Sequence, residues 1–157
     1  MMAFGRRSNT SRIARVMAGG RVDEVRDNVF RVPSRINSTW GGNLTDMVRA
    51  QRILEVIEAE GLIARAADLG ARLVAALRSL TAKYPGVAMD ARGRGLMCAI
   101  SLPDSAMRDR VIASLAAERV IMLGCGERAI RFRPALTVPE EDLARGLAAL
   151  DRALAAL

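Results

Sequence analysis

The sequence predicts an α+β fold in which a layer of helices covers a small sheet. Apolar residues recur at helical spacing from Leu44 to Leu80. Short apolar runs of strand length follow between Leu96 and Phe132, and a leucine-rich helical pattern ends the chain. The predicted order of elements from Leu44 onward is therefore α-α-β-β-α-β-β-α. A chain of 157 residues is long enough to bury a core of this kind.

Four segments have the apolar periodicity of amphipathic helices. The stripe of the first consists of Met47, Ala50, Ile53, Leu54 and Ile57. Gly61 interrupts the pattern, and a second stripe continues until the Tyr84–Gly86 turn stops it. A third helix is predicted after Pro103-Asp104. The fourth follows Thr137–Glu140, which has the spacing of a capping box.

The strand predictions rest on shorter patterns. Leu96–Leu102 is a nearly continuous apolar run, and Val120–Leu123 reads as a buried strand ended by glycines. In the segment that follows, Ile130 and Phe132 alternate with arginines, which predicts a strand with one face in the core. Upstream, only Val16–Met17 and Val29–Val32 could form strands. Residues 1–42 are otherwise irregular and should leave apolar surface exposed.

Composition excludes several classes of function. The chain has no histidine, which excludes histidine-dependent catalysis and, with only two cysteines, argues against a metal site. Cys98 and Cys125 are expected to be buried, reduced thiols. The sequence contains no apolar run of 18 residues and no signal-peptide pattern, so a cytoplasmic protein with no membrane segment is expected.

The net charge of +7 arises from an arginine-rich opening. Of the 23 arginines, eight lie between Arg6 and Arg35, where only three acidic residues occur. Aromatic residues make up only 3% of the chain, so stacking on nucleic-acid bases is not favoured. We expect no nucleic-acid partner. The opening is expected to contact an acidic partner or the rest of a larger protein.

The segment "SRINSTWGGN" (34–43) has the composition of an anion-binding loop. The hydroxyls of Ser38 and Thr39, the amides beside Gly41-Gly42 and the start of the following helix could together hold a phosphate. A plain helix cap with a glycine turn is the alternative. The pattern of residues leaves both interpretations open.

A second candidate for anion binding is Arg131. An arginine on a strand whose neighbours face the core is held rigidly, and its guanidinium can bind a carboxylate through two parallel hydrogen bonds. A solvated arginine on an edge strand is the alternative. Arg92 and Arg94 are expected to be ordinary charged residues of a turn.

Taken together, these motifs resemble a known family. "NVFRVPSRINSTWGGN", "DARGRGLMCAISLP" and "IRFRPALTV" look like the C-terminal third of the class III pyridoxal-phosphate-dependent aminotransferases, and most like its L-lysine 6-transaminase group. The resemblance implies fold type I, with residues 1–42 a remnant of the large domain and 43–157 a helical linker and the small C-terminal domain. It implies that Thr39 and Ser38 bind the cofactor phosphate across a homodimer interface. Asn37 and Arg131 would bind the substrate, with Arg131 holding its carboxylate.

The sequence departs from the family at the lysine that binds pyridoxal phosphate, because Arg6 stands where that lysine is expected. Arginine keeps its proton and cannot form the imine. The only lysine, Lys83, is expected at the surface. No residue of this chain is therefore assigned a catalytic role, and the chain alone, truncated relative to the family, should show no transaminase activity.

Two alternatives remain at this stage. The chain could be a non-catalytic remnant or a dimerisation module that docks onto a full-length relative. Within the class, it could resemble ornithine, acetylornithine or 4-aminobutyrate transaminases.

Overall fold

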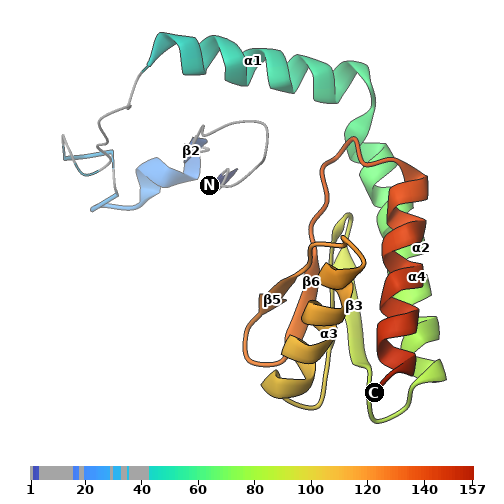
Figure 1. The fold of residues 1–157 in the computed structure, drawn as a ribbon. Helices are drawn as coiled ribbons and strands as arrows, with labels where there is room; N and C mark the ends of the chain where they lie inside the picture. The colour runs from blue at the N-terminus through green and yellow to red at the C-terminus, as the bar shows by residue number, and fades with distance from the viewer. Residues whose placement is uncertain (1, 4–15, 18–19, 29, 33–34, 36–42) are drawn as a thin grey trace. The chain divides into compact units, whose positions relative to one another are not determined.

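A computed structural model describes residues 2–3, 16–17, 20–28, 30–32, 35 and 43–157 (Figure 1). The chain divides into two compact units, Met1–Glu60 and Gly61–Leu157, and each is described by itself. No helix among these described residues is long and apolar enough to cross a membrane. The predicted division at residues 42 and 43 concerns the complete family fold and stays a prediction.

The described residues of the first unit form two short strands, a 3₁₀ helix and one long α-helix. β1 (Met2–Ala3) pairs antiparallel with β2 (Val16–Met17), and η1 (Gly20–Glu24) follows. The strand predicted at Val16–Met17 is confirmed. The strand predicted at Val29–Val32 is wrong over residues 30–32, because the amide of Arg31 closes a turn onto the carbonyl of Asn28.

The long helix of the first unit, α1 (Leu44–Ala59), begins at the predicted residue. None of its residues is buried, and Leu44 and Val48 are 76% and 68% exposed. Phe30 is also exposed, as expected for the apolar residues of this region.

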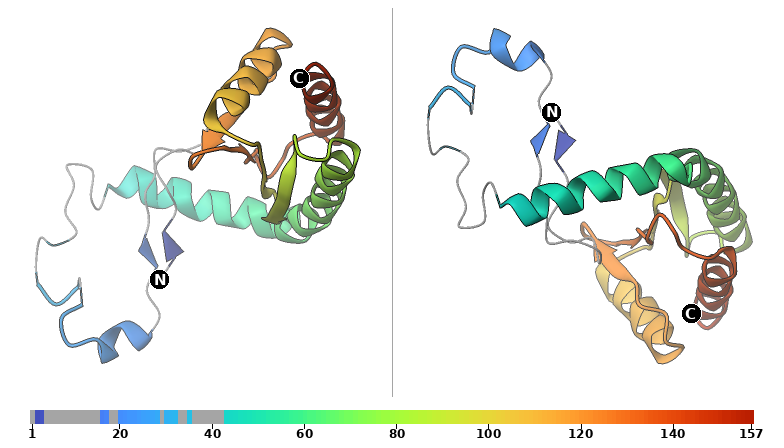
Figure 2. Two further views of the ribbon diagram at one scale, coloured as in Figure 1. Left: turned by 90° about the horizontal axis from the view of Figure 1, so that it is seen from below. Right: turned by 90° about the horizontal axis from the view of Figure 1, so that it is seen from above.

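The second unit is an antiparallel sheet with helices packed on one face (Figures 1 and 2). Its helices are α2 (Leu62–Lys83), α3 (Ser105–Ala117) and α4 (Glu140–Ala155). Its strands are β3 (Met89–Arg94), β4 (Met97–Ser101), β5 (Leu123–Cys125) and β6 (Ala129–Phe132), in the order β3-β4-β6-β5. The α-α-β-β-α-β-β-α order from Leu44 is confirmed.

The core of the second unit lies between the helices and one face of the sheet. Leucines of α2 recur every three or four residues, so that one stripe of the helix is buried. This stripe meets the inward side chains of β4 and β6, and α3 and α4 close the remaining sides. The fully buried large side chains are Leu73, Leu77, Ile100, Leu102, Val111, Leu115, Ile130 and Leu150.

Two helix starts were predicted from the residues before them, and the structure bears out the one for α3 but not the capping box of α4. α3 begins where the carboxylate of Asp104 accepts the amide of Met107 at 2.7 Å, an N-cap that satisfies one of the free amides. The predicted capping box at Thr137–Glu140 is wrong. The N-cap of α4 is Pro139 and no side chain caps it, so the acidic residues of its first turn complement the helix dipole instead.

The position of β5 at the edge of the sheet contradicts two further predictions, the buried strand Val120–Leu123 and the burial of Cys125. The apolar run Val120–Leu123 is not a buried strand, because β5 begins only at Leu123, all of its residues are exposed and Ile121 is 87% exposed. An edge position explains this, since β5 pairs on one side only. For the same reason Cys125 is an exposed free thiol, whereas Cys98 is buried as expected.

Candidate functional site

Arg131 lies in β6, an inner strand of the sheet. Ile130 and Phe132 on either side of it are 0% and 5% exposed and belong to the core. The predicted alternation is therefore confirmed, and the Arg131 side chain lies on the opposite face. Because β6 pairs with β4 and β5 on its two sides, the edge-strand alternative for Arg131 is wrong.

The face of the sheet that carries Met97, Ala99 and Arg131, here called the open face, holds few groups that could compete for the guanidinium. Arg131 lies opposite Ala99 of β4 and opposite Leu123 of β5. Within the part of the chain that the structure describes, no residue forms an ion pair or hydrogen bond with the Arg131 side chain. A half-buried arginine on a rigid strand, without a protein carboxylate, is suited to bind an external carboxylate.

Arg92 and Arg94 are strand residues, which corrects the prediction that they belong to a turn. Both lie in β3, and Arg92 is opposite Ala99 in the register. The Arg92 guanidinium donates to the Asp90 carbonyl at 2.8 Å and to the Ser101 hydroxyl at 3.0 Å. The two strands approach closely here, since a Cβ at Gly93 would lie 2.6 Å from the Cys98 sulfur. Arg92 is thus engaged within the sheet.

Lys83 lies at the surface, as predicted, and the structure adds that it forms an ion pair there. Its ammonium group lies 2.8 Å from both carboxylate oxygens of Asp151, whose Oδ1 also accepts the Tyr84 hydroxyl at 2.7 Å. The hydrogen bond to Asp151 raises the pKa of Lys83 above its ordinary value. A protonated amine is not a nucleophile, so this lysine does not fit the role of an imine-forming residue.

This cluster predicts a specific dependence of stability on pH. The hydrogen bonds from Lys83 and Tyr84 lower the pKa of Asp151 below its ordinary value of 3.8. A carboxyl group whose pKa is lower in the folded state stabilises the fold above pH 3.8, and this contribution is lost as the pH falls through its folded-state pKa. We expect Asp151→Asn to lower the melting temperature at pH 7 and to have a smaller effect near pH 2.

Thermal unfolding between pH 2 and pH 7, followed by circular dichroism, measures this difference. Asp68→Asn is the matched control, because Asp68 is an exposed aspartate of α2 whose side chain is 3.4 Å from Arg72. Equal losses in both variants at every pH would contradict the assignment to Asp151.

The other predicted site residues lie outside the described part of the chain. These are Arg6, Asn37, Ser38 and Thr39. The helix that follows them is described from its cap onward: Asn43 accepts the amide of Thr45 at 2.9 Å and that of Asp46 at 3.3 Å. Two of the free amides of α1 are therefore satisfied by its own cap, as the plain-cap alternative proposes for the helix start. Any anion site here would rely on the preceding loop.

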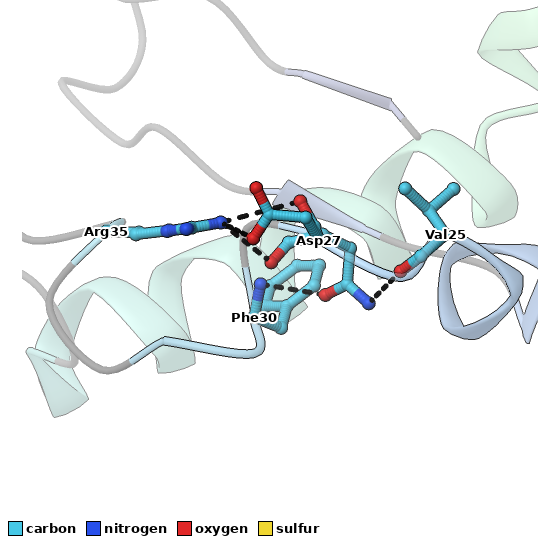
Figure 3. A network of polar contacts seen from close by, with 5 residues as sticks. Val25, Asp27, Phe30 and Arg35 are labelled. Carbon is cyan, nitrogen blue, oxygen red and sulfur yellow. Dashed lines mark hydrogen bonds and ion pairs between the residues drawn. The ribbon is translucent and has the colours of Figure 1, made fainter.

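The segment before this loop is fixed by a local network (Figure 3). Asn28, one of the few buried polar residues, donates to the carbonyl of Val25 at 3.0 Å and accepts the amide of Phe30 at 2.9 Å. The guanidinium of Arg35 donates to the carboxylate of Asp27 at 2.7 Å. At least one arginine of the basic opening is thus paired with an acidic residue within the first unit.

No structural role for Arg65 was predicted from the sequence. Arg65, in the first turn of α2, donates to the backbone carbonyls of Leu136 at 2.7 Å and Val138 at 2.6 Å. No local pattern identifies it, because its partners are more than 70 residues away. No group of acidic and cysteine residues in the described part of the chain could hold a metal ion.

Comparisons with known proteins identify a family and close relatives. Residues 13–154 match the family model described as aminotransferase class-III. The L-lysine-epsilon aminotransferase of Mycobacterium tuberculosis is 56% identical over 98% of this chain and 34% of its own length. That of Amycolatopsis lactamdurans is 50% identical over 99% of this chain and 34% of its own length. The chain thus spans about a third of the length of these relatives.

Solved structures give the same picture. The lysine aminotransferase from M. tuberculosis in the internal aldimine form matches with a TM-score of 0.83 and 56% identity, over 98% of this chain and 35% of that one. An ornithine aminotransferase from Toxoplasma gondii, with partial occupancy of PLP at its active site, matches with a TM-score of 0.69 and 29% identity, over 80% and 30% of the two chains. The sheet and helices described above are therefore a fragment of the fold of these PLP-dependent enzymes.

Proposed function

We propose a function from one premise: this chain belongs to the class-III aminotransferases. Our proposal is that it is a polypeptide of the lysine 6-transaminase type. The complete enzyme would transfer the terminal amino group of L-lysine to 2-oxoglutarate with pyridoxal phosphate as cofactor. This assignment is supported by the identity of 50% and 56% to L-lysine-epsilon aminotransferases.

Arg131 carries the part of this function that the second unit can supply. Its guanidinium would bind the carboxylate of the amino acid or of 2-oxoglutarate through two hydrogen bonds. The supporting observation is its position on an inner strand, on the open face, without a described carboxylate partner. A fixed strand presents the two donors in one plane, which matches the geometry of a carboxylate.

The roles of Thr39, Ser38 and Asn37 rest on the resemblance of their motif. Thr39 and Ser38 would bind the phosphate of the cofactor in a neighbouring subunit of a homodimer, and Asn37 would lie at the substrate. In this view residues 1–42 belong to the large cofactor-binding domain and residues 43–157 to the linker and small domain. A cytoplasmic location is proposed with this role.

The sequence of this chain does not fit covalent attachment of the cofactor. Pyridoxal phosphate, when bound, withdraws electrons from the amino acid that it holds. Attachment requires a free lysine amine, but by the resemblance Arg6 would stand at the expected position, and Lys83 is paired with Asp151. We therefore propose that the 157-residue chain alone does not catalyse transamination.

One experiment tests both parts of the proposal. Purified protein is mixed with pyridoxal phosphate, L-lysine and 2-oxoglutarate, and we expect no amino transfer and no near-visible absorption from a lysine-bound cofactor. Calorimetry should detect binding of 2-oxoglutarate. Arg131→Met should weaken it about 10- to 100-fold, the equivalent of losing hydrogen bonds to a charged group.

The control for the binding measurement is Arg110→Met, an exposed arginine of α3 whose loss should leave the affinity unchanged. Equal affinities for the wild type and Arg131→Met would contradict the assignment of Arg131. Measurable amino transfer by the wild type would contradict the proposed inactivity.

A second candidate function is that of a non-catalytic interaction module that forms a homodimer or docks onto a full-length relative. The observation that favours it is apolar exposure on the second unit, where Met97 is 63% and Leu123 is 55% exposed. Light scattering tests the self-association that this candidate requires, and a monomer at all concentrations would argue against it. Ornithine and 4-aminobutyrate transamination remain alternatives within the class, and 4-aminobutyrate aminotransferases are 35% identical over 78% of this chain.

A further inference from the structure

Arg65 ties the first turn of α2 to the segment that follows β6. Its two terminal nitrogens donate separately to the carbonyls of Leu136 and Val138, at 2.7 Å and 2.6 Å. Leu136 lies inside a tight turn and Val138 ends it, because the amide of Val138 donates to the carbonyl of Ala135 at 3.1 Å. One guanidinium therefore holds two carbonyls of this turn, one inside the turn and one at its last residue.

This turn has few other contacts that could fix it. Leu136 is 37% exposed, and Ala135 and Thr137 are exposed as well. Val138 is the exception, because it packs against a small cluster formed by Ala66, Leu69 and Leu96. Backbone carbonyls outside regular structure need hydrogen-bond donors, and Arg65 supplies them at this turn.

The connection from the turn to Arg131 is short and stiff. Phe132 is the last residue of β6, and Arg133 and Pro134 lead directly into the turn. The ring of Pro134 fixes its own φ angle, and it confines Arg133 to extended conformations. A displacement of the turn therefore displaces the end of β6 as well, because the backbone between them has little rotational freedom to absorb it.

We propose that Arg65 is a positioning residue for the carboxylate site at Arg131. Arg65 touches neither substrate nor cofactor. It holds the turn at residues 135–138, and through Pro134 it keeps the C-terminal end of β6, and with it the Arg131 guanidinium, in the orientation that accepts a carboxylate. This inference rests on the proposed function of Arg131.

The test uses the full 157-residue chain and the variant Arg65→Met. Nuclear magnetic resonance should show shifted backbone signals for Arg131 and Arg133 and faster hydrogen exchange of the Val138 amide. The affinity for 2-oxoglutarate, measured by calorimetry, should fall about three- to tenfold, as expected when a modest positioning contribution is lost. Arg65→Lys keeps the positive charge but lacks the planar fork of two separate terminal nitrogens, so it should have an intermediate effect.

The matched control is Arg78→Met, because Arg78 is an exposed α2 arginine whose side chain forms no hydrogen bond or ion pair with a residue in the described ranges. This control should change neither the Arg131 signals nor the affinity. If Arg65→Met alters only residues 135–138 and leaves the signals of Arg131 and the affinity unchanged, the inference is wrong. Should Arg65→Met fail to fold, an unshifted Arg131 signal in Arg65→Lys would be equally decisive.

The same data separate this inference from the proposed function. If the wild type does not bind 2-oxoglutarate, the proposed role of Arg131 fails. The backbone signals of Arg131 would still show whether Arg65 positions the end of β6, because they do not depend on a bound ligand.

Discussion

A Gly70→Ala variant is expected to lose about 3 kcal/mol of unfolding free energy, at the upper end of the usual cost of overpacking. Gly70 is buried in α2 against the turn between β3 and β4. An added methyl group would overlap the carbonyl group of Gly95 and lie 2.5 Å from its Cα. These are backbone atoms of a tight turn, in which Gly95 has a φ of +54°, so they cannot move aside as a side chain could.

Urea denaturation followed by circular dichroism measures this loss. Gly146→Ala is the matched control, because Gly146 lies in α4 and a Cβ there would meet no atom within 4 Å. That substitution should stabilise the protein by about 0.5–1 kcal/mol through helix propensity. If the two variants were equally stable, α2 would not approach the β3–β4 turn as closely as described.

Leu77→Ala is expected to cost about 3 kcal/mol, within the range measured for leucine truncation in protein cores. Leu77 is 0% exposed and lies in the middle of the buried stripe of α2. Its loss removes apolar contacts and leaves a cavity beneath the sheet, between α2 and the strand residues of the core.

The control for this prediction is Ile63→Ala on the same helix. Ile63 is 75% exposed, so its truncation should change stability by less than about 0.5 kcal/mol. Equal losses for Ile63 and Leu77, measured by urea denaturation, would show that the face of α2 assigned to the core is wrong.

The two stability predictions bear on function because they concern the elements that support Arg131. The sheet is stabilised on one face by the helical core, so β6 is held on one side by Ile130 and Phe132 and presents Arg131 on the other. A carboxylate site on this strand is therefore as rigid as the core beneath it. The remaining parts of a class-III aminotransferase lie in the two-thirds of the relatives that this chain does not span.

Features set by local periodicity could be predicted from the sequence. The order of helices and strands from Leu44 followed from apolar spacing of 3.6 or 2 residues. The same alternation correctly separated Arg131 from Ile130 and Phe132. Predictions failed where a short pattern depended on its neighbours in space: Val120–Leu123 has strand composition, but the strand lies at an edge and begins only at Leu123.

The family, the order of helices and strands from Leu44, and the single lysine at Lys83 could all be read from the amino-acid sequence. The folded structure was needed to show that Lys83 is paired with Asp151, that Arg65 holds the turn after β6, and that Arg131 lies on an inner strand. The difference lies in how far apart in the sequence the interacting residues are. Periodicity and turn chemistry act over a few residues, whereas these contacts join residues tens of positions apart, and their geometry exists only after the core has packed.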